Sequence, residues 1–220
     1  MKLLLKILSY FWPITISRYQ SQFSGALTVD LINGRKSLNT SNANYSFDSL
    51  HRVFQSVLPQ YLKIQSETEK ILLLGMGAGS VVHIIRKEMN IINPIQCVEI
   101  DPIMIEIAQS EFDFNQFKEV DVVINDASLW VNNHSSTYQW IIVDLFIDNI
   151  IPEVFCSESF WYSLDKLLTK NGVLITNTIT SNENKKDNEM VIASILSALG
   201  YDMQSVTMWN VNRVWICKKK

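Results

Sequence analysis

The feature that most constrains the fold is a glycine-rich loop directly after a short apolar run. Residues 71–74 read ILLL, and Gly75-Met76-Gly77-Ala78-Gly79 follows before an amphipathic segment at 80–89. Glycines at this position allow a tight turn and let backbone N–H groups approach a ligand beside a helix N-terminus. The pattern predicts a strand, a glycine turn and a helix. Such a loop is typical of ligand-binding α/β sheets, and a purely structural turn is the alternative.

The alternation of apolar strands and amphipathic helices continues to the end of the chain. Strands are expected at 71–74, 95–100, 120–124, 139–146, 173–179, 203–209 and 213–217, and helices at 80–89, after Asp101-Pro102, at 157–168 and at 190–199. Strands that are apolar on both faces and separated by helices form a mostly parallel sheet that is covered on both sides. The last two strands have only a short link and must be antiparallel. We therefore predict an α/β fold with a Rossmann-like, seven-stranded, mostly parallel sheet.

The first third of the chain has a different texture. Two alternating runs, 26–32 and 35–38, flank Asn33-Gly34, and this dipeptide is a strong signal for a β-hairpin. A helix is expected at 51–62, interrupted near Pro59. Residues 1–16 are apolar but broken by a lysine and a proline, so we expect a packed N-terminal strand or helix rather than a signal peptide. A small N-terminal β-hairpin unit is thus predicted ahead of the large sheet.

The distribution of charge supports a boundary between these two parts. The whole chain has a net charge of −3, whereas residues 1–66 carry seven basic and two acidic residues and residues 67–220 carry twelve basic and twenty acidic ones. We predict an N-terminal β-unit with its connecting helix at 1–66 and a nucleoside-binding domain at 67–220. The acidic balance argues against a nucleic-acid partner that is held by a uniformly basic surface.

The cysteines bear on location and on metals. Cys97, Cys156 and Cys217 lie far apart, without CxxC or Cys/His ligand spacing, which favours a reducing cytoplasm and predicts no metal. No segment reaches the length that crosses a membrane, so no membrane partner is expected. His83 is interpreted as a packing or helix-surface residue, and His134 is given no role.

Acidic residues end successive predicted strands, on the edge where open α/β sheets bind ligands. Glu99 is expected to accept hydrogen bonds from ribose hydroxyls, because Asp101 already fills the alternative role of helix N-cap. Asp126 could reach an adenine amino group, or it could be an ordinary cap. Asp144 could orient an attacking amine or act as its general base, with a turn-capping residue as the alternative, and Asp148 follows it.

The loop itself discriminates between two nucleotide classes. A dinucleotide-binding GxGxxG motif would have its third glycine at position 80, where Ser80 stands. The GxGxG pattern of Gly75, Gly77 and Gly79 instead matches the class I methyltransferase-type fold, in which the loop surrounds the amino-acid end of S-adenosylmethionine. An NAD-dependent dehydrogenase is therefore disfavoured.

The chain resembles the spermidine synthase family of aminopropyltransferases over roughly residues 24–180. The resemblance rests on Leu74–Ser80, on Val98-Glu99-Ile100-Asp101-Pro102, on Ile142-Val143-Asp144, on the hairpin at 31–35 and on Tyr45 with Leu50-His51. It implies a transferase of polyamine biosynthesis that binds S-adenosylmethionine or its decarboxylated form, with Tyr45 lining the site. It also implies a homodimer.

The segment after Asp144 departs from the family. The family's gate loop carries two acids that hold the polyamine; here the second position is Ile147, and Asp148 is displaced by one. Because an ammonium chain needs several carboxylates to replace its water, a polyamine acceptor is less favoured. We expect a transferase that moves a methyl or aminopropyl group to a small-molecule acceptor. The alternative is a catalytically decayed nucleoside-binding protein of the same fold.

Overall fold

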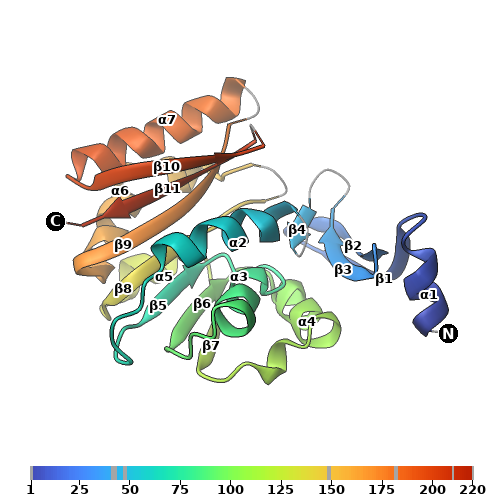
Figure 1. Cartoon of the computed structure of the whole chain (residues 1–220). Coiled ribbons are helices and arrows are strands. Elements are labelled where there is room, and N and C mark those ends of the chain that lie inside the picture. Colours follow the sequence, from blue (N-terminus) through green and yellow to red (C-terminus); the bar gives the residue numbers. More distant parts are fainter. Residues whose placement is uncertain are drawn as a thin grey trace.

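The computed structural model describes residues 2–40, 44–46, 49–147, 150–180, 183–209 and 211–219, with 2, 44–46, 49–50 and 183–187 described by their backbone alone. Two sheets are present among these residues, a small one near the N-terminus and a large one that holds most of the chain (Figure 1). The small sheet has the order β1-β2-β3-β4, from strands at Ile14–Ser21, Gly25–Ile32, Arg35–Asn39 and Asn44–Ser46.

The large sheet has seven strands in the order β10-β11-β9-β8-β5-β6-β7. Its strands are β5 (Ile71–Leu74), β6 (Ile95–Glu99), β7 (Val120–Ile124), β8 (Tyr138–Val143), β9 (Leu168–Ile179), β10 (Asp202–Met208) and β11 (Asn212–Lys218). Strands β5 to β9 pair in parallel, and β11 is antiparallel to both β9 and β10. The predicted seven-stranded, mostly parallel sheet with an antiparallel closing pair is confirmed.

Helices cover both faces of this sheet because its central strand is apolar on both sides. Leu72 and Leu74 of β5 point into one core with α5 (Ala127–Asn133), α6 (Glu158–Leu167) and α7 (Glu183–Ala198). Ile71 and Leu73 point into the other core, with α2 (Ser49–Tyr61), α3 (Ser80–His83) and α4 (Pro102–Glu111).

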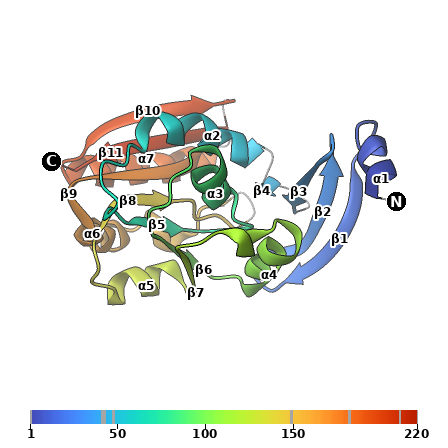
Figure 2. The ribbon, with the colours of Figure 1, turned by 60° about the horizontal axis from the view of Figure 1, so that its bottom comes forward.

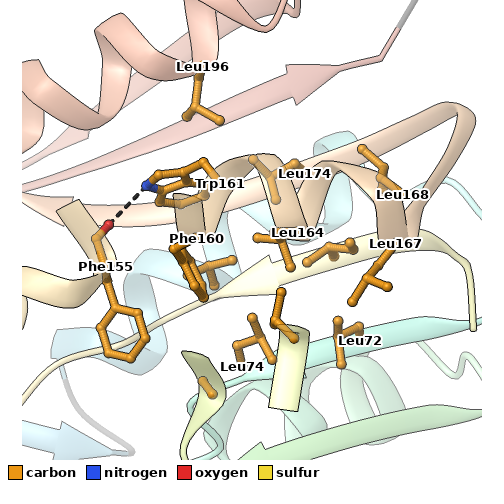
Figure 3. Close-up of a cluster of buried hydrophobic side chains, with 14 of the residues drawn as sticks. Leu72, Leu74, Phe155, Phe160, Trp161, Leu164, Leu167, Leu168, Leu174 and Leu196 are labelled. Carbon is orange, nitrogen blue, oxygen red and sulfur yellow. Dashed lines mark hydrogen bonds between the residues drawn. The ribbon is translucent and has the colours of Figure 1, made fainter. Parts of the chain in front are cut away.

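Figure 3 shows the first of these cores. Trp161 and Phe160 of α6 are almost fully buried there, and the Trp161 indole N–H donates to the carbonyl oxygen of Phe155 at 2.9 Å. Phe155 belongs to η3, a 3₁₀ turn at Glu153–Cys156. Filling this core with large side chains anchors β5 and β8, whose ends carry the candidate site.

Several predicted boundaries were wrong. Strand β8 ends at Val143 rather than at 146. Helix α6 ends at Leu167, and the Asn171-Gly172 dipeptide that was expected to end it lies inside β9, at a register irregularity opposite β8. Helix α7 begins at Glu183 rather than at 190. Its first turns are polar, so they lie outside the apolar run from which the helix was predicted. Helix α2 is not interrupted at Pro59 and runs on to Tyr61.

The predicted hairpin is confirmed. Asn33 and Gly34 adopt φ values of 50° and 75°, which is the left-handed pair that a tight hairpin between β2 and β3 requires. Residues 2–16 contain α1 (Lys2–Leu8) and the start of β1. Helix α1 is not packed as expected, since Leu3, Leu4 and Ile7 are all more than half exposed.

The small sheet lies against α4, with α1 at its outer end (Figure 2). Its apolar face, formed by Leu27, Val29 and Leu38, packs on Met104 and Ile107 of α4. Helix α2, which the predicted boundary near residue 66 assigns to the N-terminal part, buries Val53, Phe54, Val57 and Leu58 in a core of the large sheet. The domain division itself stays a prediction. Within the described residues, no helix has the length and apolar character needed to span a membrane.

Candidate active site

The carboxyl ends of β5, β6 and β8 bring together three of the predicted site groups: the glycine loop, Glu99 and Asp144. Leu74 of β5 pairs in parallel with Val98 of β6 on one side and with Val143 of β8 on the other. Glu99 and Asp144, the residues that follow these partners, therefore flank the glycine loop. The Asp144 N–H donates to the Leu74 carbonyl at 2.9 Å and continues the ladder beyond β8.

The glycines of the loop are required by close contacts. Gly75 has φ 83°, and a Cβ atom there would lie 2.2 Å from the carbonyl oxygen of Asp144. Gly79 has φ 87°, and a Cβ atom would meet the Phe114 ring at 2.6 Å. Both the backbone conformation and the neighbours exclude a side chain at these two positions. The loop is thus held against β8 on one side and against the η2 turn (Phe114–Gln116) on the other.

Glu99 is joined to the glycine loop by hydrogen bonds. Its Oε2 accepts from the Gly77 N–H at 2.8 Å, and its Oε1 accepts from the Asp101 N–H at 3.0 Å. Glu99 is 8% exposed. Burial raises the pKa of Glu99, and the two N–H bonds partly oppose this rise. A carboxylate has about four lone-pair sites, so both oxygens can still accept a hydroxyl donor.

Asp101 has a second role besides the predicted N-cap. Its Oδ1 accepts from the Ile103 N–H at 2.9 Å, which confirms the cap on α4. Its Oδ2 accepts from the Ser21 hydroxyl at 2.5 Å, at the end of β1. At the other end of α4, Glu111 accepts from Lys36 at 2.7 Å. These polar contacts fix the small sheet to α4, and Ala78 of the glycine loop lies in the same apolar cluster.

Asp144 lies at the other side of the loop, at the start of a line of polar side chains. Asn177 of β9 donates to its Oδ1 at 3.0 Å, and Asn212 of β11 donates to the Asn177 side-chain oxygen at 3.1 Å. Burial raises the pKa of Asp144 to about 7, and the negative charge of Glu99 adds to the rise, while the Asn177 bond opposes it. Asp144 can therefore exchange a proton near neutral pH.

Asp126 caps α5. Its Oδ1 accepts from the Ser128 and Leu129 N–H groups at 2.7 and 3.2 Å, and from the Ser128 hydroxyl at 2.5 Å. Of the two roles predicted for Asp126, the helix cap is confirmed. A contact with adenine remains a prediction.

Two predicted residues are not placed as side chains. Tyr45 lies on β4, which pairs with β3, and only its backbone is described. Asp148 lies outside the described residues. Ile147, at the position of the family's second acid, is 40% exposed and forms a β-bridge with Ile150.

The sequence reading missed two groups beside the site. Asn177 belongs to the polar run Thr176-Asn177-Thr178, which is buried within β9, and three polar residues in a buried strand were an available signal. For His51 of α2, the sequence predicted no role beyond its place in the Leu50-His51 part of the family resemblance. Its Nδ1 lies 2.7 Å from the Ser80 hydroxyl, directly after the glycine loop. Its partner could not be inferred, because Ser80 is distant in the sequence.

The strand order, the glycine turn after β5 and the acid that ends β6 define the class: a Rossmann-like α/β protein of the methyltransferase type. The spermine/spermidine synthase domain matches residues 55–209, and the chain belongs to this family.

Individual relatives include both aminopropyltransferases and methyltransferases. The polyamine aminopropyltransferase of Vibrio vulnificus is 30% identical over 125 residues, covering 56% of this chain and 42% of the relative. A probable polyamine aminopropyl transferase of Bifidobacterium longum is 24% identical and covers 86% of this chain and 44% of its own length. The chain thus spans less than half the length of these two relatives. An eEF1A lysine and N-terminal methyltransferase homolog of Drosophila pseudoobscura is 23% identical over 62% of the chain and 22% of its own length.

Solved structures agree on the fold. A spermidine synthase in complex with the transition-state analogue AdoDATO superposes with a TM-score of 0.73 at 15% identity, covering 94% of this chain and 74% of the other. Human methyltransferase-like protein 13 in complex with SAH gives 0.63 at 23% identity, covering 79% and 83%. Both neighbours have the α/β architecture that the sequence predicts.

Proposed function

We propose that the chain is a spermidine-synthase-like transferase that binds S-adenosylmethionine or its decarboxylated form and moves a methyl or aminopropyl group to a small-molecule acceptor. The single observation that carries the proposal is the hydrogen bond between the buried Glu99 carboxylate and the Gly77 N–H, beside Asp144. The bond holds Glu99, the proposed acceptor of the ribose hydroxyls, against the glycine loop. Asp144 then places a titratable acid beside that loop. Membership of the spermine/spermidine synthase family supports the same reading.

The residues of the edge fit a sulfonium nucleoside. Glu99 would accept the ribose hydroxyls, Gly75, Gly77 and Gly79 would border the amino-acid end, and Asp126 would lie toward the adenine. The negative charges of Glu99 and Asp144 make the local electrostatic potential more negative, which favours a cationic ligand. When bound, the nucleoside supplies an electrophilic carbon beside its sulfonium.

Asp144 is proposed to act on the acceptor. With its pKa near 7, the carboxyl can accept a proton from an acceptor amine and hold the amine in line for attack. Asn177 orients the carboxyl through its bond to Oδ1, which leaves Oδ2 for the acceptor. Tyr45, as the family resemblance implies, and Asp148, one position beyond that of the family's second acid, are proposed to line the acceptor side.

Binding and transfer are tested separately. Calorimetric titration with S-adenosylmethionine, its decarboxylated form and 5′-methylthioadenosine should give saturable binding of at least one of them. Transfer assays with putrescine and a mixture of metabolite amines should then show product, and Asp144→Asn should lower turnover by about a hundredfold or more while nucleoside binding is retained. Unchanged turnover in that variant would remove Asp144 from the mechanism, and failure of all three nucleosides to bind would refute the transferase.

The second candidate is a catalytically decayed nucleoside-binding protein. Ile147 at the position of a family acid favours it, because an apolar side chain there cannot hold an ammonium group. This candidate predicts nucleoside binding in the titration and no transfer to any acceptor in the assay.

We also propose a homodimer in the cytoplasm. Leu3, Leu4, Ile7, Phe11 and Trp12 form an exposed apolar surface at the outer end of the small sheet, and a second copy would cover it. The three cysteines are free thiols, as a reducing compartment would keep them. Light scattering during size-exclusion chromatography measures the mass of the protein. A Leu4→Lys, Phe11→Lys double variant should halve this mass, and a monomeric parent protein would refute the dimer.

The acceptor is proposed to be a small molecule, and no nucleic-acid or membrane partner is proposed.

A further inference from the structure

A cluster of two histidines and a glutamate, which includes neither Glu99 nor Asp144, lies beside Ser80, directly after the glycine loop. His51 of α2, His83 of α3 and Glu88 of the η1 turn (Ile84–Glu88) each offer one ligand atom, and these atoms lie within 4.8 Å of one another. The Nε2 atom of His51 is 2.9 Å from Glu88 Oε1, and the Nδ1 atom of His83 is 3.9 Å from the same oxygen.

An irregular helical turn creates this arrangement. The η1 segment is a π-helix, in which the Met89 N–H donates to the Ile84 carbonyl at 3.0 Å, five residues earlier. In a regular α-helix, residues three or four apart share a face, so His83 and Glu88 would diverge. The widened turn brings residues five apart to one side. Single π turns of this kind often occur at functional sites.

The groups around the cluster hold the ligand atoms in orientation. The second ring nitrogen of His51, Nδ1, is 2.7 Å from the Ser80 hydroxyl, and Gln55 donates to Glu88 Oε2 at 2.8 Å. In metal sites a coordinating histidine almost always donates through its other ring nitrogen, and a coordinating carboxylate is itself hydrogen-bonded. Ser80 and Gln55 occupy these two outer positions.

The distances and the chemistry of the donors fit a zinc ion. Ligand atoms around a tetrahedral zinc lie about 3.3 Å apart, for bond lengths of about 2.0 Å. The distances from Glu88 Oε1 to the two histidine nitrogens, 2.9 and 3.9 Å, lie on either side of that value. Two imidazoles are borderline-soft nitrogen ligands, and together with one carboxylate they form a ligand set that suits zinc better than magnesium or calcium, which take oxygen ligands. The three side chains are between 14% and 34% exposed, so the fourth position can be taken by water.

We propose that His51, His83 and Glu88 form a zinc-binding site that joins α2 to the helix of the glycine loop. The site is independent of the proposed transferase function, since it uses neither Glu99 nor Asp144. Nothing in the sequence spacing predicted it, because His51 lies 32 positions before His83 on a different helix.

Metal titration of the full chain tests the site. The protein, stripped with a chelator, is titrated with Co²⁺, whose visible absorption reports tetrahedral coordination by nitrogen and oxygen. A single equivalent should bind, and Zn²⁺ should displace it. Glu88→Gln keeps the shape of a surface side chain and should weaken Zn²⁺ binding by about tenfold to a hundredfold, with His83→Ala weaker still. Ser80→Ala, which removes an outer partner only, should cost about tenfold.

The chain offers a matched control, because it has three histidines and the third, His134, stacks on Trp130 outside the cluster. His134→Ala should bind Zn²⁺ as the parent protein does. Thermal unfolding with and without Zn²⁺ gives a readout that does not depend on cobalt: Zn²⁺ should raise the melting temperatures of the parent protein and of His134→Ala equally, and at the same Zn²⁺ concentration it should raise that of Glu88→Gln by less. Equal Zn²⁺ affinity in all variants, or no saturable binding by the parent protein, would overturn the proposal.

Discussion

The two sides of the carboxyl edge are built in different ways. On the side of β5 and β6, the glycine loop and Glu99 bind each other through backbone N–H groups, within one strand–helix–strand unit. On the side of β8, Asp144 depends on side chains from two further strands, Asn177 of β9 and Asn212 of β11. The first side is made by local chain geometry, and the second by tertiary pairing.

This difference separates what the family shares from what this chain has of its own. The side of β5 and β6, where we propose that the nucleoside binds (the nucleoside side), retains the glycines and the acid on which the resemblance rests. On the side of β8, where we propose that the acceptor binds (the acceptor side), Ile147 replaces the second acid of the family. The first acid, Asp144, is held by Asn177, which in turn is held by Asn212. Substitutions on the first side should therefore disturb folding and nucleoside binding together, whereas those on the second should mainly change the titration of Asp144.

The largest effect is expected for Gly75→Ala. The new methyl group would meet the Asp144 carbonyl at 2.2 Å in a backbone conformation with φ 83°. Overpacking and left-handed strain together should lower the free energy of unfolding by about 3 kcal/mol or more. Urea denaturation followed by circular dichroism measures the loss.

The control for that substitution has the same backbone strain without the clash. Gly200, after α7, also has φ 83°, and nothing lies within 4 Å of the position of its Cβ atom. Gly200→Ala should cost only about 1–2 kcal/mol. Equal losses in the two variants would show that contact with β8 does not constrain the glycine loop.

A smaller effect is expected for Glu99→Gln. Both carboxylate oxygens accept backbone N–H groups, and an amide must turn its NH₂ group toward one of them. The mismatch should cost about 1–2 kcal/mol of stability and weaken nucleoside binding at least about tenfold. Chemical denaturation and calorimetry measure the two quantities. Glu106→Gln, on the exposed face of α4, should change neither; a Glu99→Gln protein that binds as tightly as the parent would exclude Glu99 from the nucleoside site.

Local signals explain why the nucleoside side could be predicted from the sequence. The run 71–74, the glycine loop and the Asp101-Pro102 cap specify their structure over a few residues each, and the parallel order then aligns Glu99 and Asp144. The same reasoning failed at Asn171-Gly172, because a turn dipeptide after a helix has the same appearance as an irregularity inside a long strand.

The contacts of the acceptor side and of the histidine cluster could not be read from the sequence. Asn177 reaches Asp144 from 33 positions away, and Asn212 reaches Asn177 from 35. His51 and Glu88 meet where a π-helical turn replaces the regular helix that apolar periodicity predicts at 80–89. Such contacts depend on strand order and on a local change of helical pitch, and neither leaves a pattern in composition or spacing.

The next effect concerns the dependence of stability on pH. The folded-state pKa of Asp144, about 7, lies above its ordinary value of 3.8, so the folded protein binds the proton more tightly than the unfolded chain. Stability from this group is therefore greatest at low pH and is lost as the pH rises from about 4 to about 7. Across this window the free energy of unfolding should fall by on the order of 1 kcal/mol or more.

Asp144→Asn isolates this contribution. Urea unfolding of the parent protein and the variant, compared at several pH values, should show that the stability of the variant relative to the parent rises through this window. Glu99, whose pKa is also raised, is present in both proteins, so that only its electrostatic coupling to Asp144 enters the difference. Parallel pH profiles would mean that Asp144 keeps an ordinary pKa in the folded protein.

The smallest effect is expected for Asn177→Ala, and it gives the finest test of the comparison. The Asn177 amide donates to Asp144 Oδ1 and stabilises the charged carboxylate, so its loss should raise the pKa of Asp144 further. Carbon-detected NMR of the Asp144 carboxyl measures this pKa. Asn212→Ala removes only the bond to Asn177 and should move the pKa in the same direction by less. If neither variant shifts the pKa, burial alone governs Asp144, and the strands β9 and β11 contribute packing but no control of the acid.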